Sequence, residues 1–328
     1  MPEKKYKIAI INPFRPDGLA RTIFDGILLL NKIGYNFDFR ISSRFDYPLL
    51  LNDHFVSKDQ FINFAKDADL VFLIWGKDNT DIKLAEIIDC WRKTVFIDGS
   101  EVGKNRRYDF IIQKKIIDGQ YQDNGAINRE MLKKCPLYFR REKPYSTGIE
   151  PLPFGIETRY LQSYDKKIKK DIDFFCVFGQ EEYPLMRRYA RELLEAYCAK
   201  NGFICHTQKT KTPKEFYQVL ARSKVGISVG GGGYDSFRFW EILGNNCLLL
   251  TEKIDIFESN SRMLNYKRIF QFNNLFDFQS QLEKIGNYLK TEYKASNLEK
   301  EYEIILKQHG THSRVKKIFE VAKSRGIV

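Results

Sequence analysis

Short hydrophobic runs alternate with longer amphipathic segments along most of the chain. The runs at 69–75 and 225–229 are apolar at almost every position, which is typical of strands buried on both faces of a sheet. The segment 35–41 alternates instead, with Tyr35, Phe37 and Phe39 on one side. Further strands are predicted at 7–11, 94–97, 108–112, 137–140, 171–178, 203–206, 247–250 and 268–272.

The segments between these strands have helical periodicity. In 19–33 the side chains of Ile23, Ile27 and Leu30 share one face, and Gly34 follows as a C-terminal stop. Helices are also predicted at 58–66, 80–92, 129–134, 185–200, 213–223, 237–244, 276–289, 295–308 and 313–324. Strands and helices that alternate in this way form parallel sheets covered by helices on both faces, with ligands at the carboxyl ends of the strands. The predicted fold class is therefore α/β.

The periodic pattern stops between Ser146 and Glu157. This stretch has two prolines and two glycines and no hydrophobic periodicity, which is typical of a linker. A second α/β pattern then starts near Asp171, and a length of 328 residues favours two domains. We expect two Rossmann-like domains, 1–150 and 151–328. One alternative is that the last helices pack back on the first domain.

The stretch from Val225 to Glu252 predicts a strand, a glycine loop, a helix and a second strand. Four consecutive glycines, Gly230 to Gly233, hold no regular element because glycine loses the most backbone entropy on ordering. Asp235 or Ser236 can cap the helix that follows. A loop of this kind directs backbone N–H groups and the positive end of a helix dipole at its ligand, which is usually an anion.

Glu241 is the unusual residue of this helix. Phe237, Trp240, Glu241 and Gly244 fall on one face, so the carboxylate lies between two large aromatic rings. A carboxylate in such a place needs hydrogen-bond donors. Two interpretations remain open: Arg238 pairs with Glu241 on the surface, or Glu241 accepts hydroxyl hydrogen bonds from a ligand over the glycine loop.

Composition and charge narrow the function classes. The chain is 43% hydrophobic and carries a formal charge of +12, most of it after residue 150. The positive charge favours a phosphate-bearing ligand or an anionic membrane surface, with a solvated basic surface as the alternative. No dense Lys/Arg block with interleaved aromatics appears, so we expect no nucleic-acid partner. No apolar run reaches membrane-spanning length and the first residues lack a signal-peptide pattern, so we expect a cytoplasmic protein, with peripheral contact at the inner face of the membrane as an option.

The cysteines and histidines predict no metal site. The six cysteines show no paired spacing and several lie in apolar runs, so we expect reduced, buried thiols. His309 and His312 have no second pair of ligands to complete a zinc site. We therefore expect neither a metal nor a cofactor.

Two Rossmann-like halves with a ligand helix in the second resemble the GT-B glycosyltransferases. More narrowly, residues 170–325 resemble the CgeB/YkvP-type glycosyltransferase domain. The residues that carry this likeness are the aromatic-x-aromatic-Glu-Ile helix Phe237 to Gly244, the apolar strand Cys247 to Thr251 and the later His312 to Val315. The resemblance implies a GT-B fold, in which two parallel sheets face a central cleft.

The resemblance also implies where a donor binds. In GT-B enzymes the Glu of this helix accepts hydrogen bonds from the ribose hydroxyls of a nucleotide sugar, and the preceding loop contacts the diphosphate and the sugar. Many retaining members carry another Glu eight residues earlier, where this chain has Gly233, so Asp235 or backbone N–H groups would replace it. The expected donor-binding residues are Glu241, Arg238, Gly232, Gly233, Tyr234, Asp235, Ser236, Gly179 and Arg187.

Metal-independent transfer needs positive groups at the departing diphosphate, since no divalent ion stabilises it. Arg187, Arg188 and Arg238 are the candidates, although the Arg187–Arg188 pair also suits a solvated helix face. An inverting reaction needs a base for the acceptor hydroxyl. Asp98 is the first candidate and Asp17 and Glu101 are the others, with a turn role for Asp98 before Gly99 as the alternative.

The predicted function is transfer of a sugar from a UDP- or GDP-linked donor, bound in the second domain, to a hydroxyl acceptor held by the first. The acceptor is a glycan, a lipid-linked molecule or a protein, and the sugar and stereochemical outcome stay open. One alternative is a non-catalytic nucleotide-sugar-binding protein of the same fold, which the glycine at 233 favours. Another GT-B enzyme, such as a sugar-nucleotide epimerase, is the second alternative.

Overall fold

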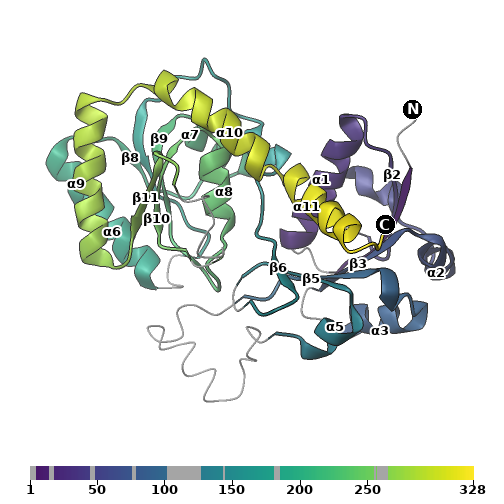
Figure 1. The fold of residues 1–328 in the computed structure, drawn as a ribbon. Coiled ribbons are helices and arrows are strands. Elements are labelled where there is room, and N and C mark those ends of the chain that lie inside the picture. The colour runs from purple at the N-terminus through teal and green to yellow at the C-terminus, as the bar shows by residue number, and fades with distance from the viewer. Residues whose placement is uncertain are drawn as a thin grey trace. The chain divides into compact units, whose positions relative to one another are not determined.

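The chain divides into two compact units. A computed structural model describes residues 5–14, 18–44, 49–75, 79–101, 127–142, 145–180, 185–254, 256 and 265–328. The first unit comprises Met1–Val102, Asn124–Gly155 and Thr311–Val328, and the second comprises Gly103–Asp123 and Ile156–Gly310 (Figure 1). Each unit contains one parallel β-sheet of its own.

The first unit has a six-stranded sheet in the order β2-β1-β3-β4-β5-β6. Its strands are β1 (Tyr6–Ile11), β2 (Phe37–Ile41), β3 (Leu70–Trp75), β4 (Thr94–Asp98), β5 (Leu137–Arg140) and β6 (Ile149–Pro151). Its helices are α1 (Gly18–Lys32), α2 (Lys58–Asp67), α3 (Asn79–Ile88), α5 (Arg129–Lys134) and α11 (Thr311–Ser324), with short 3₁₀ turns at Leu49–His54 and Trp91–Lys93. All five strand pairings are parallel, as the alternating pattern predicts.

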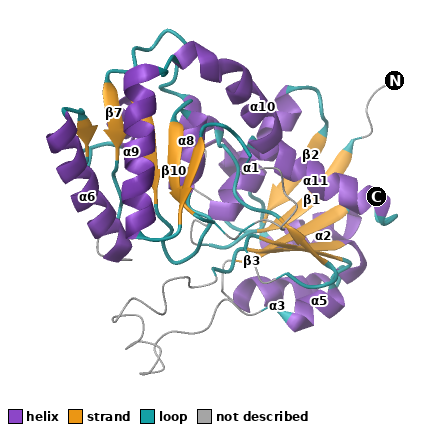
Figure 2. Ribbon diagram, turned by 60° about the vertical axis from the view of Figure 1, so that its left-hand side comes forward, coloured by secondary structure: helices purple, strands orange, loops and turns teal. Residues whose placement is uncertain are grey.

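Helices cover both faces of this sheet (Figure 2). Phe61 of α2, Ala85 of α3 and Met131 of α5 pack in one hydrophobic cluster with residues of β1, β3 and β4. On the other face α11 packs along α1, where the Thr311 hydroxyl donates to the Asp25 carboxylate at 2.6 Å. The last helix of the chain is thus part of the first unit.

The second unit has a five-stranded parallel sheet in the order β11-β10-β9-β7-β8. Its strands are β7 (Ile172–Phe175), β8 (Cys205–His206), β9 (Ser223–Ser228), β10 (Leu248–Glu252) and β11 (Ile269–Phe272). Its helices are α6 (Leu185–Asn201), α7 (Pro213–Ala221), α8 (Phe237–Gly244), α9 (Leu275–Thr291) and α10 (Glu299–His309), with 3₁₀ turns at Thr158–Leu161 and Ala295–Leu298.

The position of α8 follows from the alternation of side chains along β9. Val225 and Ile227 face a hydrophobic cluster that includes residues of α6 and α9. Gly226 lies between them and faces the other side, where a Cβ atom would come within 2.5 Å of the Ile242 side chain on α8. Glycine at 226 therefore lets α8 pack directly on the strand whose carboxyl end leads into the glycine loop.

Several boundaries differ from the sequence predictions. Ile149–Pro151 lies inside the predicted linker but forms β6, which pairs with β5 at the sheet edge. The helix predicted at 80–92 ends at Ile88, because Asp89 adopts a left-handed conformation with φ of 52° and a 3₁₀ turn follows. The strand predicted at 108–112 lies outside the described residues.

Candidate functional site

The glycine loop lies at the carboxyl end of β9, in the middle of the second sheet. Within the loop, Gly230 N–H donates to the Glu252 carboxylate at 3.3 Å, and Gly231 N–H donates to the Gly233 carbonyl at 3.0 Å. The described glycines with positive φ lie elsewhere in the chain, so this loop does not use the left-handed conformations that glycine permits. At Gly231 the small size of the residue, rather than its φ range, is what the structure uses.

Arg187, near the start of α6, reaches this loop. Its guanidinium donates to the Val229 carbonyl at 3.3 Å and to the Gln180 carbonyl at 3.1 Å. A Cβ atom on Gly231 would lie 2.9 Å from the same guanidinium, so glycine is needed there for the close approach. Arg187 therefore places a positive charge beside the loop, at the carboxyl ends of β7 and β9.

Arg188 differs from its neighbour. It pairs with Glu192 one turn later on α6 at 3.6 Å, and its guanidinium lies over the ring of Tyr189. These contacts belong to the exposed helix surface. The two adjacent arginines thus have different surroundings, and Arg187 is the one beside the glycine loop.

Glu241 on α8 has two protein donors. The Tyr217 hydroxyl, from α7, donates to Oε1 at 2.9 Å, and the Arg238 guanidinium pairs with Oε2 at 2.5 Å. The pairing with Arg238 predicted from the spacing is therefore present, but the pair is largely buried rather than on an open surface. The Glu241 side chain keeps 12% of its surface exposed. A carboxylate has about four lone-pair sites, so two protein donors leave acceptor capacity for a ligand.

Arg238 is held by rings as well as by charge. Its guanidinium lies 4.2 Å from the ring centroid of Phe216 and 5.7 Å from that of Phe175. Stacking of this kind orients a guanidinium while leaving its edge able to donate. Side chains of α7 and of the end of β7 thus hold Arg238 and Glu241, which lie together on α8, in fixed positions.

Glu157, Arg159 and Tyr160 form a second polar group within the second unit, and the sequence interpretation placed Glu157 in the linker. Arg159 pairs with the fully buried Glu157 at 2.6 Å, and the Tyr160 hydroxyl donates to the same carboxylate at 3.0 Å. Burial, and then the charges of Glu157 and Glu241, raise the pKa of Tyr160. The Tyr160 and Tyr217 rings lie 5.9 Å apart, which connects this group to Glu241.

Tyr217 is the other residue that the sequence did not single out. Burial first, and then the charge of Glu241, raise the pKa of Tyr217 well above its usual value. The phenol therefore stays protonated and donates to the carboxylate at neutral pH. The periodicity of α7 marks Tyr217 as a packing residue, and nothing in the spacing connects it to a carboxylate 24 positions later.

The structure also describes the other residues predicted to bind the donor. Asp235 is buried and accepts a hydrogen bond from the Trp240 indole at 2.7 Å. Ser236 occupies the N-cap position of α8 but its side chain makes no capping bond and lies 3.2 Å from the Ser228 hydroxyl, so the predicted side-chain cap by Ser236 is wrong. Gly233 is buried, Gly232 and Tyr234 are half-buried, and Gly179 is exposed after β7.

Asp98, the first candidate base, lies at the end of β4 with no exposed surface. Its carboxylate accepts from the Tyr138 hydroxyl and from the Ser100 backbone N–H at 2.8 Å, and it pairs with Arg140 at 2.7 Å. Burial, and then the charge and hydrogen bond of Asp98, raise the pKa of Tyr138. The Asp98 contacts tie the ends of β4 and β5 together, as a structural ion pair does.

Of the other two base candidates, the structure describes Glu101. Glu101 is half-buried and accepts a hydrogen bond from Arg141 at 3.2 Å. Asp17 lies outside the described residues. A catalytic role for Asp98, Glu101 or Asp17 stays a prediction.

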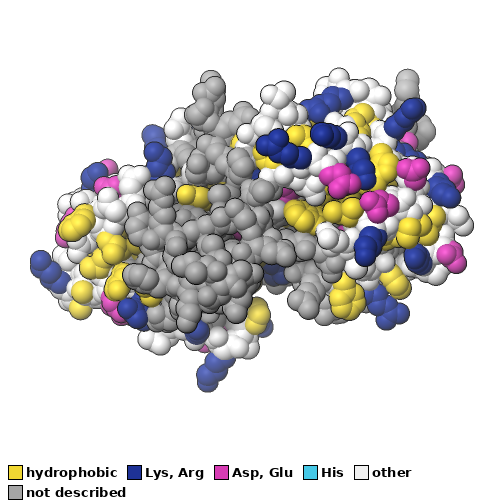
Figure 3. Space-filling view, turned by 90° about the horizontal axis from the view of Figure 1, so that it is seen from below, with side chains coloured by type: hydrophobic (Ala, Val, Ile, Leu, Met, Phe, Trp, Pro, Cys, Tyr) yellow, Lys and Arg dark blue, Asp and Glu magenta, His cyan; other side chains and the backbone are white. Residues whose placement is uncertain are grey.

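The described residues also bear on metal binding and membrane crossing. Within them, no group of three or more His, Cys, Asp or Glu side chains could hold a metal ion. Over the same part of the chain, no helix has both the length and the apolar character that crossing a membrane requires. On the face in Figure 3, the Lys and Arg side chains of the described residues lie scattered among hydrophobic and acidic ones.

Comparison with known proteins identifies the fold. No family model and no curated protein matches the sequence. Among solved structures, an α-glucosyltransferase in complex with UDP has a TM-score of 0.61 at 10% identity, covering 97% of this chain and 100% of that one. A glycosyltransferase from Rickettsia africae has a TM-score of 0.61 at 12% identity, with 98% of both chains covered. HepE from Anabaena, in complex with UDP-glucose, has a TM-score of 0.53 at 10% identity, covering 97% and 100%.

The chain therefore has the α/β fold of the GT-B glycosyltransferases, with two parallel sheets, and the predicted fold class is confirmed. Identities near 10% establish the fold alone. The narrower resemblance to the CgeB/YkvP-type domain stays a prediction.

Proposed function

We propose that this protein is a glycosyltransferase that moves a sugar from a nucleotide-diphosphate sugar to a hydroxyl acceptor without a metal ion. The observation that carries the proposal is the position of Glu241: a partly exposed carboxylate, held by Tyr217 and Arg238, on the helix that follows a glycine loop. The GT-B fold supports it, because the related structures named above include enzymes bound to UDP and UDP-glucose.

The donor would bind to the second unit. Glu241 would accept hydrogen bonds from the ribose, and the glycine loop with the N-terminus of α8 would face the diphosphate. Arg187 is the cation beside the loop and would stabilise the charge that develops on the departing nucleotide diphosphate. A UDP- or GDP-linked sugar is the proposed donor.

The acceptor would bind to the first unit, and we propose a glycan, a lipid-linked molecule or a protein as its class. Because Asp98 already has three donors and no exposed surface, we infer that it supports the acceptor side structurally and does not take the acceptor proton. We propose no nucleic-acid acceptor, although several structures of the similar α-glucosyltransferase contain DNA.

Thermal shift with UDP, GDP, CMP and dTDP, and with their sugar conjugates, tests the donor site. We expect one nucleotide to raise the unfolding temperature, and Glu241→Gln to weaken its binding about 10- to 100-fold, since a hydrogen bond to a charged group contributes about 1.5–3 kcal/mol. Glu192→Gln, on the exposed surface of α6, is the matched control and should bind as the wild type does.

Three results would count against the proposal. Stabilisation by no nucleotide, or equal binding by the Glu241→Gln and wild-type proteins, would remove the donor site. Nucleotide-sugar binding without hydrolysis of the donor or transfer to any acceptor would instead favour the non-catalytic alternative, in which Gly233 marks the lost sugar-binding carboxylate.

A further inference from the structure

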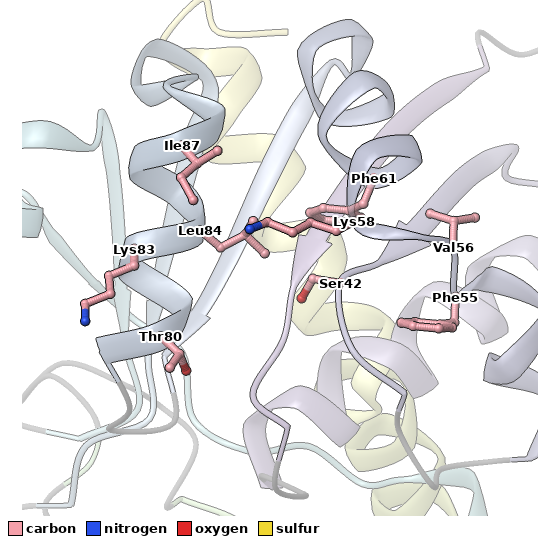
Figure 4. A pocket seen from close by; sticks show the side chains of 9 residues that line it. All are labelled: Ser42, Phe55, Val56, Lys58, Phe61, Thr80, Lys83, Leu84 and Ile87. Carbon is pink, nitrogen blue, oxygen red and sulfur yellow. The ribbon is translucent and has the colours of Figure 1, made fainter.

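The first unit contains a cavity that the proposed donor site does not use. It has a volume of about 460 Å³ and lies between α2 and α3 (Figure 4). Ser42, just after β2, and Thr80, at the start of α3, place it at the carboxyl ends of β2 and β3. Parallel sheets bind their ligands at this end of the strands, and the volume falls in the range of about 300–1,000 Å³ typical of small-molecule sites.

The walls of the cavity are apolar. Phe55 and Val56 approach from the segment before α2, Phe61 from α2, and Leu84 and Ile87 from α3. Ile87 is 54% exposed although it points toward the other lining residues in Figure 4. An aliphatic chain placed among these side chains would remove apolar surface from water on both partners, at about 25 cal/mol per Å².

The charges at the cavity are all positive. Lys58 and Lys83 are lining residues, and no Asp or Glu is among them. In Figure 4 the Lys58 side chain extends from α2 toward Leu84, whereas Lys83, the residue before Leu84 on α3, points away from the other lining residues. Arg44 does not line the cavity, but its guanidinium lies 5.4 Å from the ring centroid of the lining residue Phe55.

Lys58 is the cation best suited to bind an anion at this cavity, because no carboxylate in the described part of the chain neutralises its charge. Among the described residues, neither Lys58 nor Lys83 forms an ion pair. A lysine that lays its methylene stem over an apolar wall can present its ammonium group to an anion at the mouth. The site therefore combines apolar walls with one cationic group, the Lys58 ammonium.

We propose that this cavity binds a single-chain amphipathic anion, an alkyl chain that ends in a phosphate, with the chain against Phe61, Leu84 and Ile87 and the phosphate at Lys58. A free phosphate would leave the apolar walls exposed, and a neutral lipid would leave the lysines without a counter-charge. The further role of the bound molecule as the acceptor, or as the carrier of the acceptor, rests on the proposed function, whereas its binding does not.

Isothermal titration of the full chain with decyl phosphate, kept below the concentration at which it aggregates, tests this proposal. We expect saturable binding that Lys58→Gln weakens about tenfold, because the variant loses a charge-assisted contact to the phosphate. Lys66→Gln, in the last turn of the same helix, should have no effect. Ile87→Ser should weaken binding several-fold, while Ile33→Ser, at a position 63% exposed, should not.

Two further ligands test the apolar walls and the cationic group separately. Decanol has the chain without the charge and inorganic phosphate has the charge without the chain, so each should bind at least about tenfold more weakly than decyl phosphate. The proposal is overturned if decyl phosphate does not bind, if decanol or inorganic phosphate binds equally well, or if Lys58→Gln and Ile87→Ser both bind as the wild type does.

Two controls distinguish this cavity from a membrane-docking surface and from the donor site. Binding only to vesicles of phosphatidylcholine with phosphatidylglycerol, and not to monomeric decyl phosphate, would overturn the proposal in favour of a membrane-docking surface. Glu241→Gln should weaken nucleotide binding, as stated above, and leave decyl phosphate binding unchanged. Failure of the nucleotide arm alone would therefore count against the donor site and not against this cavity.

Discussion

Asp98 and Glu241 have the same kinds of partner in the two units of the molecule. Each carboxylate accepts a hydrogen bond from a tyrosine hydroxyl and pairs with an arginine: Tyr138 and Arg140 for Asp98, and Tyr217 and Arg238 for Glu241. The two carboxylates differ in their further donors and in their exposed surface. Asp98 has a third donor, the Ser100 N–H, and no exposed surface, whereas the Glu241 side chain is 12% exposed.

This difference separates a structural carboxylate from one that can bind a ligand. An ion pair with all its hydrogen bonds made within the protein contributes by closing the end of the sheet. A carboxylate that keeps an exposed edge, and is oriented by two donors, is prepared to accept further hydrogen bonds. The tyrosine and the arginine alone do not distinguish the two carboxylates, whereas the third donor and the exposed surface do.

The largest effect that would test this comparison is on stability. Asp98→Asn removes the buried carboxylate charge that pairs with the fully buried Arg140, and removal of one partner of a buried pair costs about 3–5 kcal/mol. Urea unfolding should therefore show the first unit to be strongly destabilised. Asp38→Asn in the same unit removes a partly exposed carboxylate that pairs with Lys5 and Arg40, and should cost under about 1 kcal/mol.

Equal unfolding free energies for the Asp98→Asn and wild-type proteins would contradict the structural role of Asp98. A stable variant that had lost transfer activity would instead restore Asp98 as the candidate base. The measurement therefore decides between the two interpretations that the Asp98–Gly99 sequence left open.

The strands and most helices could be predicted because hydrophobic periodicity is a local property of the chain. The misses have local causes too. β6 is a three-residue edge strand inside a Pro- and Gly-containing segment, so it carries no period of its own. The helix α3 ends early at Asp89, where a left-handed φ breaks a pattern that the side chains alone would continue.

The candidate site was predictable only where its residues are close in sequence. Arg238 and Glu241 are three positions apart on one helix, so their pairing follows from the spacing. Tyr217 reaches Glu241 from another helix, and Arg187 reaches the loop from α6. Such contacts depend on how strands are ordered in the sheet, which periodicity does not give. The spacing also gave no way to tell Arg187 from Arg188.

An intermediate effect is expected from the tyrosine that orients Glu241. Tyr217→Phe keeps the ring but removes the hydroxyl that donates to Oε1, and such a bond contributes about 1 kcal/mol. We expect nucleotide binding to weaken about fivefold, with little change in unfolding. The dissociation constant of the nucleotide that stabilises the wild type measures this effect.

Tyr293→Phe is the matched control for this variant. Tyr293 belongs to the same unit, and its buried hydroxyl has no hydrogen-bond partner among the described residues, so its removal should leave nucleotide binding unchanged. If Tyr217→Phe also bound as the wild type does, the contact between Tyr217 and Glu241 would be packing only. The comparison between the two carboxylates would then rest on exposure alone.

The smallest effect is expected at Gly231, and it tests whether the loop acts through Arg187. A Cβ atom there would lie 2.9 Å from the guanidinium, so Gly231→Ala should displace Arg187 from the Val229 carbonyl without unfolding the unit. Nucleotide binding should weaken two- to threefold, which is about 0.5 kcal/mol. Because both changes act on one group, Gly231→Ala should have little further effect in an Arg187→Ala background. Additive losses of affinity in the double variant would show that the loop and Arg187 contribute to binding independently. The close approach of Arg187 to Gly231 would then not be what positions its charge for the nucleotide.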